Sequence, residues 1–130
     1  MKSPGHQTWP DHQVREEHLD ERVLVEINGE IVADSRDIIR VDEDESPPRY
    51  YFPRADVRME KLEPSDTESQ CPFKGHAHYF TVNAGGKRLE DAVWTYEEPY
   101  DEHRALKDRV AFWDEKAPEI RIREGEQARA

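Results

Sequence analysis

Short runs of β-branched and aromatic residues, separated by turn signals, make up most of the hydrophobic pattern of this chain. Residues 22–27 (RVLVEI) and 30–34 (EIVAD) flank Asn28-Gly29, a pair that tolerates positive φ and favours a two-residue hairpin turn. Residues 76–83 (HAHYFTVN) and 88–96 (RLEDAVWTY) flank a pair of glycines that favours the same kind of turn. The pattern therefore predicts two β-hairpins, the second with a kink near its Glu-Asp step.

The remaining apolar runs are also short, and they predict additional strands rather than long helices. These strands are expected at residues 37–41, 50–52, 58–62, 110–113 and 119–123. Short helical segments are expected just after Pro53 and at residues 101–108, where Asp101 can cap the first turn. Residues 63–75 show little periodicity and predict a long loop. Many short strands with no long helices between them predict a small, mainly β, antiparallel domain with at most two short helices.

The two ends of the chain carry little material for a hydrophobic core. Residues 1–20 predict a polar arm, in which residues 14–19 could form a turn or two of helix, and residues 124–130 predict a polar tail. Charged residues are 38% of the chain and hydrophobic residues 35%, so we expect the core to be concentrated in one domain at residues 21–123. Positions expected to be solvated are His6, His12, His18 and the acidic run at residues 42–45.

The net charge of −11 argues against several classes of function. Nucleic-acid binders usually present a basic face to phosphates, and no cluster of Lys and Arg here is large enough to do so. The same acidity disfavours anionic membranes, and no apolar run approaches the length of a membrane span. One cysteine cannot form an internal disulfide or a multi-cysteine zinc cluster. We therefore expect a soluble cytoplasmic protein, monomeric or homodimeric, without a cofactor.

Five short motifs link the chain to a known family. They are the runs YYFPRADV, EPSD, CPFKG, DAVWTYEEP and VAFW, which occur in this order between residues 50 and 113. Together they closely resemble a bacterial family catalogued as domain of unknown function 427. The resemblance implies a compact β-tent-like domain related in shape to small zinc-binding domains, here without their paired-cysteine zinc knuckles. One catalogue gives this family a nucleotidyltransferase label, but the sequence has neither a phosphate-binding loop nor the paired acidic strand of that chemistry.

The segment at residues 50–75 is where chemistry is expected, because it mixes aromatic, cationic and thiol groups with little periodicity. Cys71 could be a nucleophile whose pKa is lowered by Lys74. Asp66 and Arg54 could then position a substrate. Each residue also has a structural alternative: Cys71 as a small buried hydrophobe, Lys74 as a surface lysine beside a turn, and Asp66 as a turn cap. Whether the protein is an enzyme stays open at this point.

Candidate ligand-binding residues lie in the same segment and in the strand that follows the second hairpin turn. Arg54 and Arg58 would share a face of a helical turn, where guanidinium groups suit a carboxylate or phosphate, or they could simply pair with nearby acidic residues. Trp94 and Tyr96 alternate on one face of their strand, a pattern typical of core as well as of a binding site. Tyr51 is the candidate from the strand before Pro53.

His76 and His78 form an H-x-H pair that would face one side of a strand. That spacing can ligate a metal, with Cys71 as a third ligand. The family pattern does not require histidine at either position, so the resemblance gives no support to a metal. We therefore expect no metal site, and a metalloprotein is kept as the weaker alternative.

The function that the sequence favours is binding of a small anion or polar metabolite in a pocket. The pocket would form where residues 63–75 lie against the aromatic strand, because cationic and polar groups among aromatic rings are the usual composition of such sites. The alternative is a protein-interaction or structural domain without catalysis, in which Cys71 is buried and inert. The two hypotheses differ in whether the candidate side chains gather around one cavity.

Overall fold

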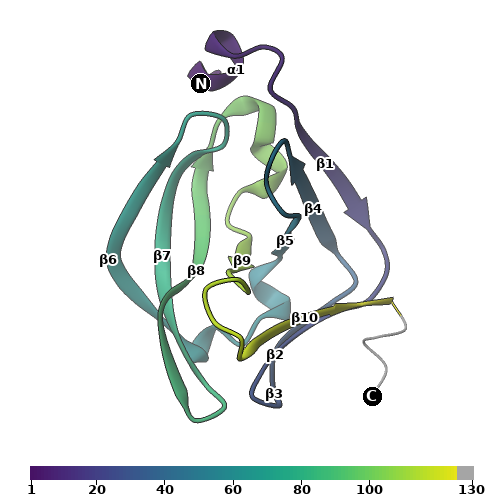
Figure 1. Cartoon of the computed structure of the whole chain (residues 1–130), viewed down its shortest axis with the longest axis vertical. Coiled ribbons are helices and arrows are strands. Elements are labelled where there is room, and N and C mark those ends of the chain that lie inside the picture. The colour runs from purple at the N-terminus through teal and green to yellow at the C-terminus, as the bar shows by residue number, and fades with distance from the viewer. Residues whose placement is uncertain (126–130) are drawn as a thin grey trace.

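The computed structural model describes residues 1–125, which form ten β-strands and four short helical segments (Figure 1). In chain order they are α1 (Pro4–Thr8), β1 (Val14–Leu19), β2 (Val23–Ile27), β3 (Glu30–Ser35), β4 (Ile38–Glu43), β5 (Arg49–Phe52), the 3-10 helices η1 (Arg54–Asp56) and η2 (Met59–Lys61), β6 (Leu62–Cys71), β7 (Gly75–Ala84), β8 (Lys87–Pro99), the 3-10 helix η3 (Asp101–Leu106), β9 (Val110–Phe112) and β10 (Ile120–Glu124). Of the predicted tail, only Glu124 and Gly125 lie within the described residues. None of the helices described is long and apolar enough to cross a membrane.

The strands form two antiparallel sheets, which confirms the predicted fold class. The larger sheet has seven strands in the order β1-β4-β5-β9-β8-β7-β6, and the smaller has three in the order β10-β2-β3. The edge strands of the larger sheet, β1 and β6, do not pair with each other within residues 1–125. The larger sheet is therefore open and not a closed barrel. In Figure 1, β6, β7 and β8 stand on one side of the molecule and β1 and β4 on the other, while the smaller sheet lies across the lower end.

Both predicted hairpins are present, and their turns are set by residues with positive φ. Asn28 and Gly29 have φ of 48° and 86°, and Gly85 and Gly86 have φ of 57° and 75°, as two-residue hairpin turns require. The second turn also packs against the first hairpin. A Cβ at Gly85 would lie 2.2 Å from the carbonyl oxygen of Ile27, so only glycine fits there.

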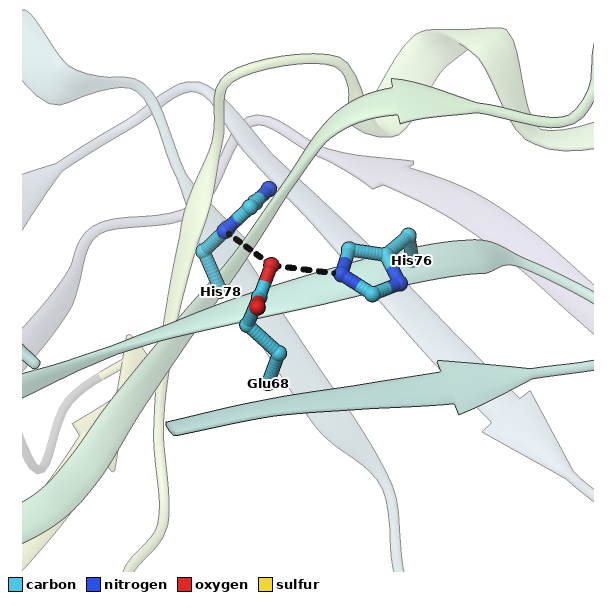
Figure 2. Close-up of side chains that lie close together, drawn as sticks. All are labelled: Glu68, His76 and His78. Atoms are coloured by element: carbon cyan, nitrogen blue, oxygen red, sulfur yellow. Dashed lines mark hydrogen bonds and ion pairs between the residues drawn. The ribbon is translucent and has the colours of Figure 1, made fainter. Parts of the chain in front are cut away.

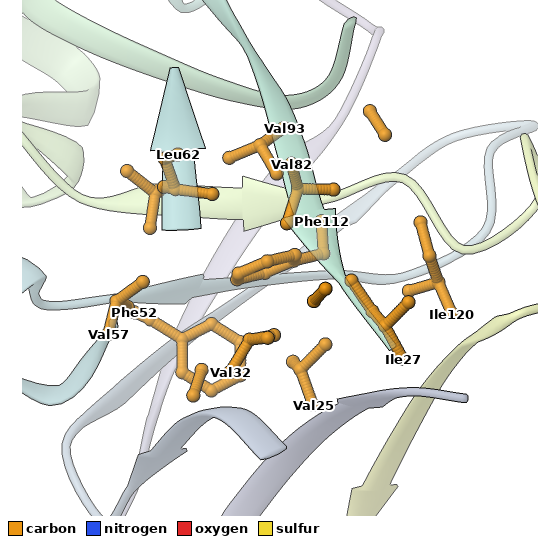
Figure 3. Close-up of a cluster of buried hydrophobic side chains, with 14 of the residues drawn as sticks. Val25, Ile27, Val32, Phe52, Val57, Leu62, Val82, Val93, Phe112 and Ile120 are labelled. Atoms are coloured by element: carbon orange, nitrogen blue, oxygen red, sulfur yellow. The ribbon is translucent and has the colours of Figure 1, made fainter. Parts of the chain in front are cut away.

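Two hydrophobic clusters cover the two faces of the larger sheet. Adjacent residues of one strand face opposite ways, so Phe52 belongs to the first cluster and Tyr51 to the second. The first cluster fills the space between the two sheets (Figure 3), and its members include Val25, Ile27, Val32, Phe52, Val57, Leu62, Val82, Val93, Phe112 and Ile120. The second cluster covers the opposite face and consists of Ile39, Val41, Tyr51, Ala77, Trp94, Tyr96, Leu106 and Ala111.

Several predicted elements were wrong, chiefly at the edges of the larger sheet. Most of the expected loop at residues 63–75 is β6, and the expected helical turn at residues 14–19 is β1. Both are edge strands whose side chains are mostly exposed, so neither carries an alternating hydrophobic pattern. The expected strand at residues 58–62 contains the 3-10 helix η2 instead. The first two residues of the acidic run, Asp42 and Glu43, belong to β4 rather than to a solvated loop.

The N-terminal segment packs against the turn between β6 and β7. Ser3 Oγ and the Gly5 amide both donate to the carbonyl oxygen of Pro72, at 2.6 and 2.7 Å. The ring of His12 stacks on Phe73 with 4.3 Å between ring centroids. His12 is therefore half-buried, and so is His6, whose Nε2 lies 2.9 Å from Nε2 of His103; the prediction that these two histidines are solvated was wrong.

Candidate functional site

A cavity of about 240 Å³ opens on the face of the larger sheet that carries the second hydrophobic cluster. Its charged lining residues are two cations and one carboxylate: Arg49, Lys74 and Glu43. Its aromatic lining residues are Tyr51, Tyr79, Trp94, Tyr96 and Trp113. An aromatic hollow with a few charged groups has the usual composition of a small-molecule site.

Strand register explains why these rings share one face. Tyr51 of β5 is paired with Ala111 of β9, Ala111 with Trp94 of β8, and Trp94 with Tyr79 of β7. Residues paired across an antiparallel sheet point to the same side, so these four side chains form one row. Tyr96 follows Trp94 by two residues and extends the row along β8. Because the residue between them is a small alanine, the rings of Tyr51 and Trp94 meet edge to face, with 6.2 Å between their centroids.

Lys74 is the most deeply placed charge of the cavity. Its ammonium group donates to Glu43 Oε1 at 2.7 Å, and the two side chains are 10% and 19% exposed. Burial alone would lower the pKa of Lys74, but nearby Tyr51, Cys71 and Glu43 outweigh burial and raise it. Burial would likewise raise the pKa of Glu43, but the hydrogen bonds and charges of Lys74 and His12 lower it. Both groups are therefore charged at neutral pH, and the alternative of a surface lysine was wrong.

The turn that carries Lys74 is fixed on both sides. Lys74 accepts a hydrogen bond from the Tyr100 amide at 2.9 Å through its carbonyl oxygen. Gly75 follows with φ of 136°, and a Cβ there would lie 3.2 Å from the Glu98 carbonyl oxygen. Phe73 is held under the N-terminal segment described above. The ammonium group therefore projects from a backbone that is anchored by both β8 and the N-terminus.

Two tyrosine side chains add hydroxyl groups to the same cavity. Trp94 Nε1 donates to the Tyr51 hydroxyl oxygen at 3.1 Å. The Tyr96 side chain is 5% exposed and lines the cavity. No fully buried polar side-chain atom in the described part of the chain lacks a hydrogen-bond partner, so the Tyr96 hydroxyl, which has no partner there, must be open to the cavity. Burial is the largest cause that raises the pKa of both tyrosines, so both hydroxyls keep their protons at neutral pH. Neutral hydroxyls can donate to a ligand.

Arg49 lies at the rim of the cavity rather than at its base. Its guanidinium carbon lies 5.4 Å from the centre of the Trp94 ring, a cation–π contact. It also forms an ion pair with Glu115 and lies 3.7 Å from Asp114. These rim carboxylates hold the arginine over the indole, and they offset its charge at the entrance.

Four of the predicted site residues meet at this cavity: Tyr51, Lys74, Trp94 and Tyr96. Cys71 is half-buried and packs against the second hydrophobic cluster beside them, close enough to Lys74 to contribute to the raised pKa of that lysine. It is not among the residues that line the cavity. The structure therefore gives Lys74 a place at the cavity wall and Cys71 a place next to it.

The other three predicted site residues lie elsewhere. Arg54 donates to the Asp108 carbonyl oxygen at 2.6 Å and to Thr95 Oγ1 at 3.2 Å, on the opposite face of β8. Arg58 is exposed near Glu30 at 3.8 Å, and Asp66 is exposed on edge strand β6. The guanidinium that reaches the cavity is instead that of Arg49.

The predicted site residues did not include Arg49 or Glu43, although one signal could have assigned both to the cavity. Arg49 precedes Tyr51 by two residues in β5, so it must share the face of Tyr51. Glu43 follows Val41 by two residues and belongs to the same face of β4. The acidic run around Glu43 hid this relation, because consecutive charges are usually solvated.

The H-x-H pair lies on the other face of the larger sheet from the cavity. His76 and His78 alternate with Ala77 and Tyr79, which face the second cluster. Cys71 also faces that cluster, so it cannot be the third ligand of a metal held by the two histidines. The nearest carboxylate on their own face is that of Glu68, which lies 2.8 Å from His76 Nε2.

Comparison with known proteins identifies a family. Residues 15–123 match the family described as domain of unknown function (DUF427). This match covers most of the chain, so the protein belongs to that family, as its five motifs predict. Among curated proteins, none matches the chain. Since the family description names no activity, the function has to be argued from the cavity itself.

Proposed function

We propose that this DUF427 protein binds a small molecule that carries one carboxylate or phosphate group. The observation that carries the proposal is a surplus of hydrogen-bond donors in a cavity that is otherwise aromatic. The anionic group would lie near Lys74, and a flat apolar part of the ligand would lie among the rings.

The surplus follows from the contacts of each polar group. Lys74 has three N–H donors and gives one to Glu43. The Tyr51 hydroxyl accepts from Trp94, which leaves its own hydrogen free to donate. The Tyr96 hydroxyl has no partner in residues 1–125 and is open to the cavity, since no fully buried polar side-chain atom of these residues is unpaired. Both oxygens of Glu43 are engaged, one by Lys74 and the other by His12 at 2.9 Å. A ligand rich in acceptors satisfies these donors without leaving a buried group unpaired.

The size of the cavity sets the class of ligand. Its volume of about 240 Å³ lies below the roughly 300–1,000 Å³ of sites for drug-sized molecules. The rings of Trp94 and Trp113 lie at right angles, with 6.3 Å between their centroids, so they form a corner into which a flat group fits. We therefore infer a metabolite no larger than one ring with one anionic substituent.

The proposal is one of binding and not of catalysis. A nucleophile would have to reach the ligand, and Cys71 packs beside the cavity without lining it. Asp66 is exposed on β6 and lies outside the lining as well. The donors described above are sufficient to hold an anion, and they need no reactive partner.

A titration that follows tryptophan fluorescence tests the proposal, because two of the lining residues are indoles. Benzoate is the probe, and benzamide is the matched neutral compound of nearly the same shape. We expect saturable quenching with benzoate and much weaker binding of benzamide. Tyr96→Phe should weaken benzoate binding by roughly 10-fold to 100-fold, since a hydrogen bond to a charged group is worth about 1.5–3 kcal/mol.

Tyr50→Phe is the control for that substitution. Tyr50 neighbours Tyr51 but faces the other side of β5, where it packs against the first cluster. Removing the Tyr50 hydroxyl should therefore leave the affinity for benzoate unchanged. Equal affinities for benzoate and benzamide, or equal effects of the two Tyr→Phe changes, would overturn the proposed anion site. Inorganic phosphate, titrated in the same way, distinguishes a phosphate ligand from a carboxylate ligand.

A further inference from the structure

Two histidines and a glutamate converge on β6 and β7, on the face of the larger sheet opposite to the cavity. Figure 2 shows the carboxylate of Glu68 between the rings of His76 and His78. Glu68 Oε1 lies 2.8 Å from His76 Nε2 and 3.4 Å from His78 Nδ1. One ligand atom from each residue lies within 4.8 Å of the other two. We propose that these three side chains form a binding site for a zinc ion.

The pairing of the two strands builds the cluster. His76 and His78 are two residues apart on β7, so their side chains leave the same face of the sheet. Glu68 of β6 is the register partner of His78, which places its carboxylate directly beside both rings. The site therefore stands on two hydrogen-bonded strands and not on a loop.

The donor set and its spacing suit zinc. Zinc accepts imidazole nitrogen and carboxylate oxygen at about 2.0–2.2 Å, usually in a tetrahedral arrangement. Tetrahedral ligands at such bond lengths lie about 3.3 Å apart. The two distances from Glu68, 2.8 and 3.4 Å, lie on either side of that value. Three protein ligands leave the fourth position to water or to another small ligand.

Groups behind the histidines already orient their rings for a metal. The Oε1 atom of Gln70 lies 3.2 Å from His76 Nδ1 and can only accept, so the Nδ1 proton points to Gln70 and Nε2 is left for the ion. Gln70 is itself held by Nε2 donation to the Tyr100 hydroxyl at 2.8 Å. Behind His78, the carboxylate of Glu97 lies 3.7 Å from Nε2, on the nitrogen that does not face Glu68.

The competing explanation is a surface ion pair between a carboxylate and charged imidazoles. All three side chains are between 42% and 51% exposed, so such a pair would add little to stability. The two explanations differ in what zinc does. If the cluster is only a surface ion pair, the protein should not bind zinc stoichiometrically. If it is a metal site, zinc should bind saturably, and removal of either histidine ring should abolish the binding.

The test is calorimetric titration of zinc chloride into the untagged 130-residue chain, in a buffer that does not chelate metals. We expect one zinc ion per chain and a rise in melting temperature on addition of zinc. His76→Ala and His78→Ala should each abolish saturable binding, while the melting temperature without zinc stays near that of the unchanged protein. Gln70→Ala should weaken binding about 10-fold to 100-fold, the usual effect of removing the partner that orients a ligand histidine.

Two further variants serve as controls. His18 is also exposed between two carboxylates, at 3.0 Å from Asp37 and 3.3 Å from Asp20, but they approach different nitrogens of its ring. His18→Ala should therefore retain full zinc binding, and so should Cys71→Ser, because the thiol faces the other side of the sheet. The proposal is overturned if the unchanged protein binds no stoichiometric zinc, if the two ligand variants still bind it, or if either control loses it.

Discussion

Replacing Lys74 with methionine should lower the free energy of unfolding by about 2 kcal/mol. A hydrogen bond to a charged group is worth about 1.5–3 kcal/mol, and the lysine loses one such bond to Glu43. Breaking a fully buried pair costs about 3–5 kcal/mol because the remaining charge has no partner. In the Lys74 variant, Glu43 still contacts His12, and its side chain is 19% exposed to water. We therefore expect a loss of stability below that of a fully buried pair. For a chain of this length, that loss corresponds to roughly 8 °C in melting temperature.

A double-mutant cycle isolates the pair from other effects. Glu43→Gln alone should also destabilise the fold, and the double variant Lys74→Met/Glu43→Gln should lose clearly less than the sum of the two single losses. Lys87→Met is the control, because Lys87 is an exposed lysine at the start of β8, and it should change stability by less than about 0.5 kcal/mol. Additive losses in the cycle would refute the claim that Lys74 and Glu43 are coupled.

The pH dependence of the pair has a definite sign. The pKa of Glu43 in the fold lies below its ordinary value of 4.5. The Glu43 carboxylate therefore contributes fully to the free energy of unfolding above pH 4.5, and this contribution is lost as the pH falls through the lowered pKa. The pKa of Lys74 lies above 10.5, so its contribution is complete below that value and is lost as the pH rises through the raised pKa. Denaturant unfolding should therefore show a constant difference in the free energy of unfolding between the protein and Glu43→Gln from about pH 8 to about pH 10, above the range in which histidine side chains change charge. A difference that does not shrink as the pH falls well below 4.5 would contradict the role of the Glu43 charge.

Two further substitutions test the packing that supports the site. Gly85→Ala should destabilise the fold by at least about 1 kcal/mol more than Gly86→Ala. Both glycines have positive φ, but only an added Cβ at Gly85 meets the Ile27 carbonyl. Equal melting temperatures for the two variants would refute that close approach. Phe112→Ala should cost about 3–5 kcal/mol, since the ring is 1% exposed and meets Phe52 edge to face at 5.9 Å; a loss below about 1 kcal/mol in denaturant unfolding would show that the core between the sheets is not as described.

The sequence predicts the central strands because their chemistry is local. A hairpin such as that of β2 and β3 is defined by its own β-branched residues and by a turn pair with positive φ. The kink expected near the Glu-Asp step of β8 is present, with φ of 53° at Asp91 and a shift in the register with β7. Strand β6 could not be predicted in this way. It is a polar edge strand that exists because β7 offers it hydrogen bonds.

The sequence could predict only which site residues share a face of the same strand, because side chains two residues apart in a strand point to the same side. The aromatic residues Trp94 and Tyr96 lie two apart, and they meet at the cavity as that spacing suggests. Arg54 was expected there because it lies near Tyr51 in the sequence, but the chain leaves β5 at Pro53 and carries Arg54 to the opposite face. The other residues of the site depend on which strands are neighbours in the sheet. Strand order is set by pairing between distant parts of the chain, and no short motif encodes it.

The proposed anion site is tested best by a crystal structure of the protein grown with benzoate. We expect density for one benzoate in the cavity, with its carboxylate within hydrogen-bond distance of Lys74 Nζ and of the Tyr96 hydroxyl, and with its ring among the aromatic side chains. A cavity that holds only water at saturating benzoate, or a carboxylate that turns away from Lys74 toward solvent, would contradict the claim that these donors form an anion site.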